Sequence, residues 1–138
     1  MPTASASTEP RGTVNSKLES MSEPSVFERI VAGEIPATKV FENERVLAIQ
    51  DIAPKAPVHL LIFPKTGVYP NVTALAAGDP GLLAEIVDVA QQLADEHAGG
   101  QYRLVFNTGE KAGQTVFHVH AHVLGNPSLG GDLSEAGM

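Results

Sequence analysis

The sequence has no cysteine among its 138 residues. This absence excludes disulfide bonds, thiol catalysis and zinc sites built on thiolates. Long apolar runs are also missing, because no segment approaches the ~20 residues of a membrane-spanning helix. The N-terminus lacks the basic and apolar segments of a secretory signal. We therefore expect, by default, a cytoplasmic protein with no membrane partner.

Basic residues are scarce. The chain has 9 Lys and Arg against 16 Asp and Glu, and its formal net charge at pH 7 is −7. DNA binding needs an extended basic surface, so we expect no DNA partner. A mononucleotide remains compatible with the charge, because one phosphate needs only a few well-directed donors.

Large apolar residues are rare at the start of the chain. Residues 1–20 are rich in Ser, Thr and Pro, and such a segment cannot bury enough surface to offset the entropy of ordering it. The length suggests one folded domain. We predict a disordered N-terminal tail over residues 1–21, the domain over residues 22–126 and a C-terminal tail over residues 127–138.

Two helices are predicted from their end signals. Ser25 and Glu28 have the spacing of a capping box, and the short helix that they begin is closed by Gly33. Asp79 is a suitable N-cap and Pro80 suits the first turn of a longer helix. The apolar residues that repeat at helical spacing in this longer helix are Leu82, Leu83, Ile86, Val87, Ala90 and Leu93.

Five strands are predicted from runs rich in β-branched and apolar residues that are separated by turn residues. These runs occupy residues 38–43, 45–52, 59–65, 102–109 and 115–125. Together with the two helices they predict an α+β domain with a five-stranded antiparallel sheet, a short N-terminal helix and one long helix.

Three of the 5 histidines lie close together at His118, His120 and His122. Because side chains alternate along a strand, we expect all three rings on one face, with Cα atoms of successive histidines about 6.5 Å apart. The intervening Val and Ala residues then pack against the helices.

Three interpretations of this histidine row remain open. Two of the rings could share a metal ion, but one strand is a poor source of three tetrahedral ligands, so zinc is disfavoured. A purely structural row would need hydrogen-bond partners for every ring. Phosphate chemistry is favoured, because an imidazole titrates near neutral pH and can serve as nucleophile, acid or anion-binding cation. The preceding segment, residues 107–115, adds glycines, an amide and hydroxyls that can surround a phosphate.

The stretch "HVHAHVL" at residues 118–124 matches the His-φ-His-φ-His-φ-φ signature, with φ apolar, of the histidine triad (HIT) family. The resemblance runs from Ser25 to Leu124. The stretches "GEIP" and "DIAPKAPVH" resemble the Hint branch of that family. The resemblance implies a HIT-like fold and a homodimer. The implied activity is metal-independent and cofactor-free hydrolysis of purine nucleoside 5′-phosphoramidates through a nucleotidyl-histidine intermediate. Two alternatives are a dinucleoside polyphosphate hydrolase, as in the Fhit branch, and a purine-nucleotide-binding regulatory protein with residual catalysis.

The resemblance also implies roles for individual residues. The nucleophile would be His120, flanked by His118 and His122, with His59 as a fourth active-site histidine. We expect the ring Nδ1–H of His120 to donate to a backbone carbonyl, which leaves Nε2 free to attack. Asp51 would accept the ribose hydroxyls. The α-phosphate would be held by Asn107, Gly113, Gln114 and Thr115, and the base by Val26, Phe27, Ile30, Ile49 and Ile52, although each of these apolar residues suits a simple core equally well.

Three departures from the family pattern bear on these expectations. Some relatives carry a Cys-x-x-Cys zinc site where this chain has Ser25 and Glu28, so we expect no zinc there. The usual Pro-Lys-Lys-His-Ile stretch reads "PKTGV" here, at residues 64–68, and lacks its histidine. The segment after the triad, "GNPSLGG", differs from the usual Gly-Gly-Arg, and this puts the preferred leaving group in doubt.

Overall fold

The computed structural model describes residues 23–127, so the predictions for the tails lie outside the described residues, apart from those for residue 127. None of the helices in this described range is long and apolar enough to cross a membrane. In chain order the elements are α2 (Val26–Val31), β1 (Lys39–Glu42), β2 (Val46–Gln50), β3 (Val58–Pro64), α3 (Val72–Gly78), α4 (Pro80–His97), β4 (Arg103–Val105), the 3₁₀ helix η2 (Glu110–Ala112) and β5 (Ala121–Gly125).

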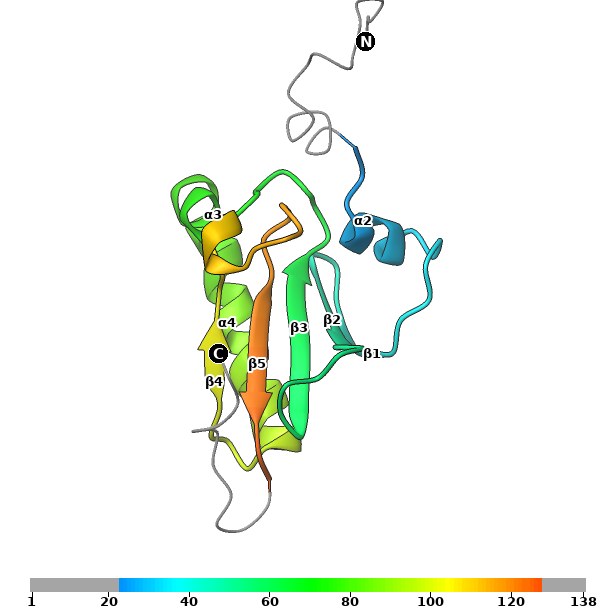
Figure 1. Ribbon diagram of the computed structural model, residues 1–138. Helices are drawn as coiled ribbons and strands as arrows, with labels where there is room; N and C mark the ends of the chain where they lie inside the picture. Colours follow the sequence, from blue (N-terminus) through cyan, green and yellow to red (C-terminus); the bar gives the residue numbers. More distant parts are fainter. Residues whose placement is uncertain (1–22, 128–138) are drawn as a thin grey trace, which may run out of the picture.

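The strands form one five-stranded sheet in the order β1-β2-β3-β5-β4, and every neighbouring pair is antiparallel. Helix α4 lies along one face of this sheet, and α2 lies at the end of the sheet where β3 finishes (Figure 1). The predicted α+β architecture, with a short N-terminal helix and one long helix, is therefore confirmed.

Alternation along the strands divides the core into two clusters. On β2, Val46 and Ala48 belong to the cluster that packs against α4, whereas Leu47 and Ile49 belong to the cluster that includes Phe27 of α2. Such alternation is what a sheet covered on both faces requires. The apolar cluster on the α4 face is the larger of the two. The α2 face carries the polar side chains of the site described below.

The two predicted helices form for the predicted reasons. Ser25 accepts from the N–H of Glu28 while Glu28 accepts from the N–H of Ser25, which completes the capping box. Asp79 caps α4 and Pro80 occupies its first turn. Two details differ from the expectation. Val87 is 39% exposed and does not belong to the core. Helix α3, capped by Asn71, and the 3₁₀ helix η2 were not predicted, because both are too short to show a clear period.

The last two strands are shorter than predicted, and the shorter β5 leaves part of the histidine row outside the strand. Strand β5 begins only at Ala121, so His118 and His120 precede it, and the expectation that one strand carries all three histidines is wrong. The ladder with β3 ends at the pair Ile62–Ala121, two residues before β3 itself ends at Pro64. The N–H of Val119 instead donates to the carbonyl of Tyr69, at 2.9 Å.

Candidate active site

Two histidines from the neighbouring strands β3 and β5 lie side by side on the face of the sheet that α2 covers. His122 lies opposite Leu61 in the β3–β5 register and His59 lies opposite Leu124, so the two histidines form a diagonal pair. His59 is buried, with 5% of its surface exposed, and His122 is half-buried. The sheet register therefore brings together residues that are 63 positions apart in the sequence.

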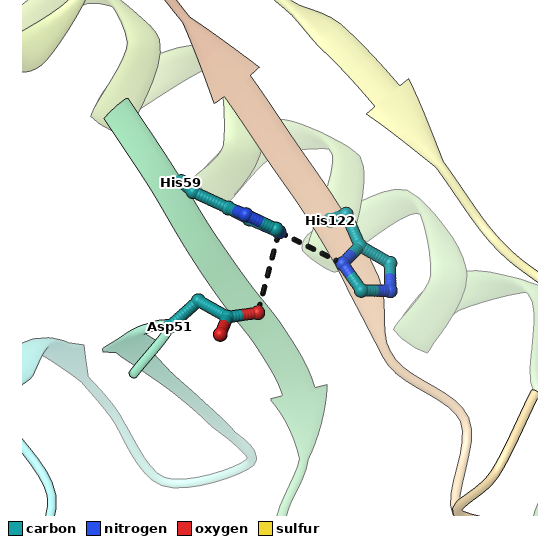
Figure 2. Close-up of side chains that lie close together, drawn as sticks. All are labelled: Asp51, His59 and His122. Atoms are coloured by element: carbon teal, nitrogen blue, oxygen red, sulfur yellow. Dashed lines mark hydrogen bonds and ion pairs between the residues drawn. The ribbon is translucent and has the colours of Figure 1, made fainter. Parts of the chain in front are cut away.

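Asp51 joins this pair because it follows β2 directly and its N–H donates to the carbonyl of His59, at 3.0 Å. The Nε2 atom of His59 lies 3.0 Å from Nδ1 of His122 and 3.3 Å from a carboxylate oxygen of Asp51. Figure 2 shows His59 between the two other side chains. The other carboxylate oxygen of Asp51 accepts from the N–H of Ala53, at 2.7 Å, which fixes the carboxylate in the loop.

His118 is buried to 1% exposure, and both of its ring nitrogens have protein partners. Nε2 lies 2.7 Å from the carbonyl oxygen of Pro64, and Nδ1 lies 2.6 Å from the hydroxyl of Ser25. With both nitrogens engaged, the side chain of His118 has none left for a substrate. It is a structural member of the triad.

His120 is held by the backbone. Its Nδ1 lies 2.8 Å from the carbonyl oxygen of His118, in agreement with the expectation that Nδ1–H donates to a main-chain carbonyl. The ring of Phe27 covers it at a centroid distance of 4.9 Å, and the ring of His122 lies 5.3 Å away. Phe27 also contacts the ring of His118, so the rings of all three triad histidines are linked through Phe27 and His120, although only His122 is part of the strand.

Burial keeps all four of these rings neutral at pH 7. Desolvation is the largest cause that lowers the pKa of His59, of His118 and of His120 below the usual value for histidine. The pKa of His122 is lowered to about 4, first by burial and then by repulsion from His120 and His59. Neutral imidazoles carry one proton each, so the position of that proton decides what each ring can do.

Fixed backbone groups determine where those protons lie. A carbonyl can only accept, so His118 carries its proton on Nε2 and His120 carries its proton on Nδ1. The N–H of Lys55 donates to Nδ1 of His59, at 2.9 Å, so the proton of His59 is on Nε2. That proton points at Nδ1 of His122, which leaves the proton of His122 on its own Nε2. The result is a lone pair on Nε2 of His120 beside an N–H donor on His122.

The four residues predicted to hold a phosphate fall into two groups, according to whether their hydrogen-bond donors are already used. Gln114 is buried, and its side-chain amide donates to the carbonyls of Pro70 and Val116. The backbone N–H groups of Gly113 and Gln114 are used within the turn around η2. Both residues therefore use these N–H groups within the loop, and their contact with a phosphate stays a prediction.

The side-chain donors of Asn107 and Thr115 are not used by the described fold. Among residues 23–127, neither side chain has a hydrogen-bond partner, and Thr115 is exposed. Strand β4 ends at Val105, which pairs with His122, and Asn107 follows two residues later. These two residues, rather than Gln114, are the available donors on this side of the histidines.

The residues predicted to line a base pocket also divide into two groups. Phe27, Ile30 and Ile49 are buried in the cluster on the α2 face, where they form core. Val26 is 38% exposed and Ile52 is 99% exposed. Only these last two apolar side chains are available at the surface, and Ile52 is the immediate neighbour of Asp51.

A metal ion fits this cluster poorly. The ligand atoms of Asp51, His59 and His122 all lie within 4.8 Å of one another, which is close enough for one ion. If Nε2 of His59 bound a metal, however, its proton would have to move to Nδ1, where it would face the N–H of Lys55. At the positions of the zinc-binding cysteines of some relatives, Ser25 and Glu28 are already joined in the capping box.

Sequence reasoning missed three groups of this site, namely the N–H of Lys55, the carbonyl of Pro64 and the hydroxyl of Ser25. The first two are backbone groups that leave no mark in the sequence. Ser25 was interpreted only as a helix cap, and its contact with His118, 93 positions away, carries no local signal.

Comparisons with known proteins show which family the chain resembles. Residues 24–135 match the family model described as "Scavenger mRNA decapping enzyme C-term binding". An uncharacterised HIT-like protein of Synechocystis is 43% identical over 106 residues, which cover 76% of this chain and 92% of the relative. The purine nucleoside phosphoramidase of Escherichia coli K12 is 37% identical over 120 residues, which cover 86% of this chain and all of the relative.

Solved structures give the same picture. A HIT family hydrolase from Clostridium thermocellum superimposes with a TM-score of 0.71 at 42% identity, covering 80% of this chain and 97% of the other. A zinc-bound histidine triad family protein from Mycobacterium smegmatis superimposes with a TM-score of 0.63 at 38% identity, covering 77% and 76%. The fold is an antiparallel five-stranded α+β domain that carries the histidine triad at the end of its sheet. The chain belongs to the histidine triad family.

Proposed function

We propose that this protein hydrolyses purine nucleoside 5′-phosphoramidates through a covalent nucleotidyl-His120 intermediate. The main support is the proton pattern of the site, in which His120 offers a lone pair on Nε2 and His122 offers an N–H donor beside it. A nucleophile and a donor whose protonation states are fixed in advance are what attack on a phosphoryl group requires. The named activity of the Escherichia coli relative supports the choice of substrate.

In the first step, Nε2 of His120 attacks the α-phosphorus, the bond from phosphorus to the amine nitrogen breaks, and the amine takes up a proton. In the second step, water attacks the same phosphorus, the bond to His120 breaks, and water gives up a proton. We infer that His122 takes up a second proton from solvent when the substrate binds, that its Nε2–H proton passes to the amine in the first step, and that Nε2 accepts the proton released by water in the second, so that His122 returns to its protonation state in the substrate complex. Binding of an anionic phosphoryl group opposes the burial effect on His122, which favours proton uptake in the complex.

The nucleoside would bind beside Asp51. Its carboxylate is half-buried at the edge of the site and can accept from ribose hydroxyls. Ile52 is fully exposed next to it, and an apolar side chain in that position is suited to contact a flat base. Asn107 and Thr115 would donate to the phosphoryl oxygens.

A kinetic panel tests the substrate. The untagged protein is assayed with an adenosine 5′-phosphoramidate and with diadenosine triphosphate, without added metal and with a chelator present. We expect kcat/KM to be higher on the phosphoramidate and unaffected by the chelator. Faster cleavage of the dinucleotide would replace the proposal with the dinucleoside polyphosphate hydrolase. Tight AMP binding without turnover of either compound would favour the regulatory nucleotide-binding protein.

We further propose that the protein is a homodimer. Strand β4 is an edge of the described sheet, and an unpaired edge favours addition of another strand. Val87, a large apolar residue of α4, is partly exposed and suits an interface. Size-exclusion chromatography with light scattering should give about twice the chain mass of 14.5 kDa. A single species at the chain mass across micromolar concentrations would contradict this prediction.

A further inference from the structure

We propose that Ser25 is a positioning residue for the nucleophile, acting through His118. This inference deepens the proposed function and rests on His120 as the attacking group. It begins from the 2.6 Å contact between the Ser25 hydroxyl and Nδ1 of His118, which joins the N-cap residue of α2 to the first histidine of the triad.

The direction of this hydrogen bond is fixed by the partners on either side. Because His118 donates from Nε2 to the Pro64 carbonyl, its Nδ1 is an acceptor and the hydroxyl of Ser25 is the donor. The same hydroxyl oxygen accepts from the N–H of Glu28, at 3.0 Å. Ser25 therefore donates and accepts at once, which a hydroxyl does and an alanine at the same position cannot.

The geometry of the surrounding cluster also holds Ser25 in place. The carboxylate of Glu28 accepts from the N–H of Ser25, at 2.9 Å. That carboxylate occupies the space beside Gly67, where an added Cβ would lie 2.5 Å from it. The missing side chain at position 67 thus leaves room for the capping box, and the capping box directs the Ser25 hydroxyl at His118.

The effect reaches His120 through the backbone. With both ring nitrogens bound, His118 cannot rotate, and its own carbonyl keeps the orientation in which it accepts from Nδ1 of His120. Phe27, two residues after Ser25 on α2, contacts the rings of both His118 and His120. Helix α2 therefore controls the orientation of the Nε2 lone pair at two points, and Ser25 is the polar one.

The test compares Ser25→Ala with Ser25→Thr, which keeps the hydroxyl, and with Asp79→Ala, which removes the N-cap of α4. No hydrogen bond or ion pair joins Asp79 to a histidine within residues 23–127, so its replacement is a control for the loss of a helix cap, together with the exposed ion pair from Asp79 to Arg45. Well below the melting temperature, we expect Ser25→Ala to lower kcat on the phosphoramidate about tenfold, with KM unchanged. Ser25→Thr and Asp79→Ala should stay within about twofold of the parent chain. If Ser25→Ala keeps the parent kcat while its melting temperature falls as in Asp79→Ala, Ser25 is only a helix cap.

A second readout does not depend on turnover. Long-range ¹H–¹⁵N NMR correlations of the imidazoles distinguish a ring protonated on Nδ1 from one protonated on Nε2. The parent chain should show His120 protonated on Nδ1, and Ser25→Ala should show a mixture of both forms. An unchanged Nδ1–H signature in Ser25→Ala would overturn the inference, even if no phosphoramidate were a substrate. A mixture without any measurable turnover would support the inference about Ser25 and contradict the proposed function.

Discussion

Replacement of His120 by alanine should lower kcat on an adenosine 5′-phosphoramidate by about 10⁴-fold or more. The reason is that Nε2 of this ring is the atom proposed to form the bond to phosphorus, and no other side chain of the site can take its place. His118 has no free nitrogen, and His122 presents a proton at Nε2 in place of a lone pair. Steady-state kinetics on the purified variant measure the loss.

His97→Ala is the control for the loss of an imidazole, because His97 lies at the exposed end of α4, where its ring pairs with Glu96. We expect its activity to be within twofold of the parent. Rapid quenching of the parent enzyme with substrate should trap a nucleotidyl adduct, and peptide mapping should place it on His120. Parent-level turnover by His120→Ala, or an adduct on a different residue, would eliminate the proposed mechanism.

Much of this arrangement could be predicted from the sequence because it follows local rules. The capping box at Ser25 and Glu28 depends on spacing within one turn, and the period of α4 is visible in its own residues. The pairing of His120 Nδ1 with a main-chain carbonyl follows from what a neutral nucleophilic imidazole requires.

The remainder depends on contacts that no local pattern encodes. The ladder between β3 and β5 stops at the pair Ile62–Ala121, and the N–H of Val119 donates to the carbonyl of Tyr69 instead, so His118 and His120 lie outside the strand. The family resemblance implies that Gln114 contacts the phosphate, yet the folded loop uses both N–H groups of its side-chain amide. In each case the competing partner is a backbone group brought near by the tertiary fold, and the sequence does not reveal it.

His122→Ala should produce the second-largest loss, about 10²- to 10³-fold in kcat, which is typical for removal of a general acid–base group. The variant keeps the His120 nucleophile and its carbonyl partner, so the adduct should still form, but slowly. A good leaving group distinguishes the two roles. With a nucleotide ester of an acidic phenol, which departs without a proton, His122→Ala should recover much of its rate while His120→Ala should not. Equal losses on both substrates would show that His122 does not transfer the proton.

The variant His59→Asn tests whether His59 sets the pKa and the proton position of His122. In the folded chain, repulsion from His59 is one cause of the low pKa of His122, about 4, after burial and the effect of His120. Removing His59 removes that repulsion and opens the buried contact to water, so the pKa of His122 should rise toward its ordinary value. It also removes the N–H that selects the Nδ1-acceptor form of His122. An NMR titration of the His122 ring should therefore show protonation at higher pH in the variant, together with a smaller loss of kcat than in His122→Ala. An unchanged His122 pKa would mean that burial and His120 account for the shift, and that His59 does not set the protonation of its neighbour.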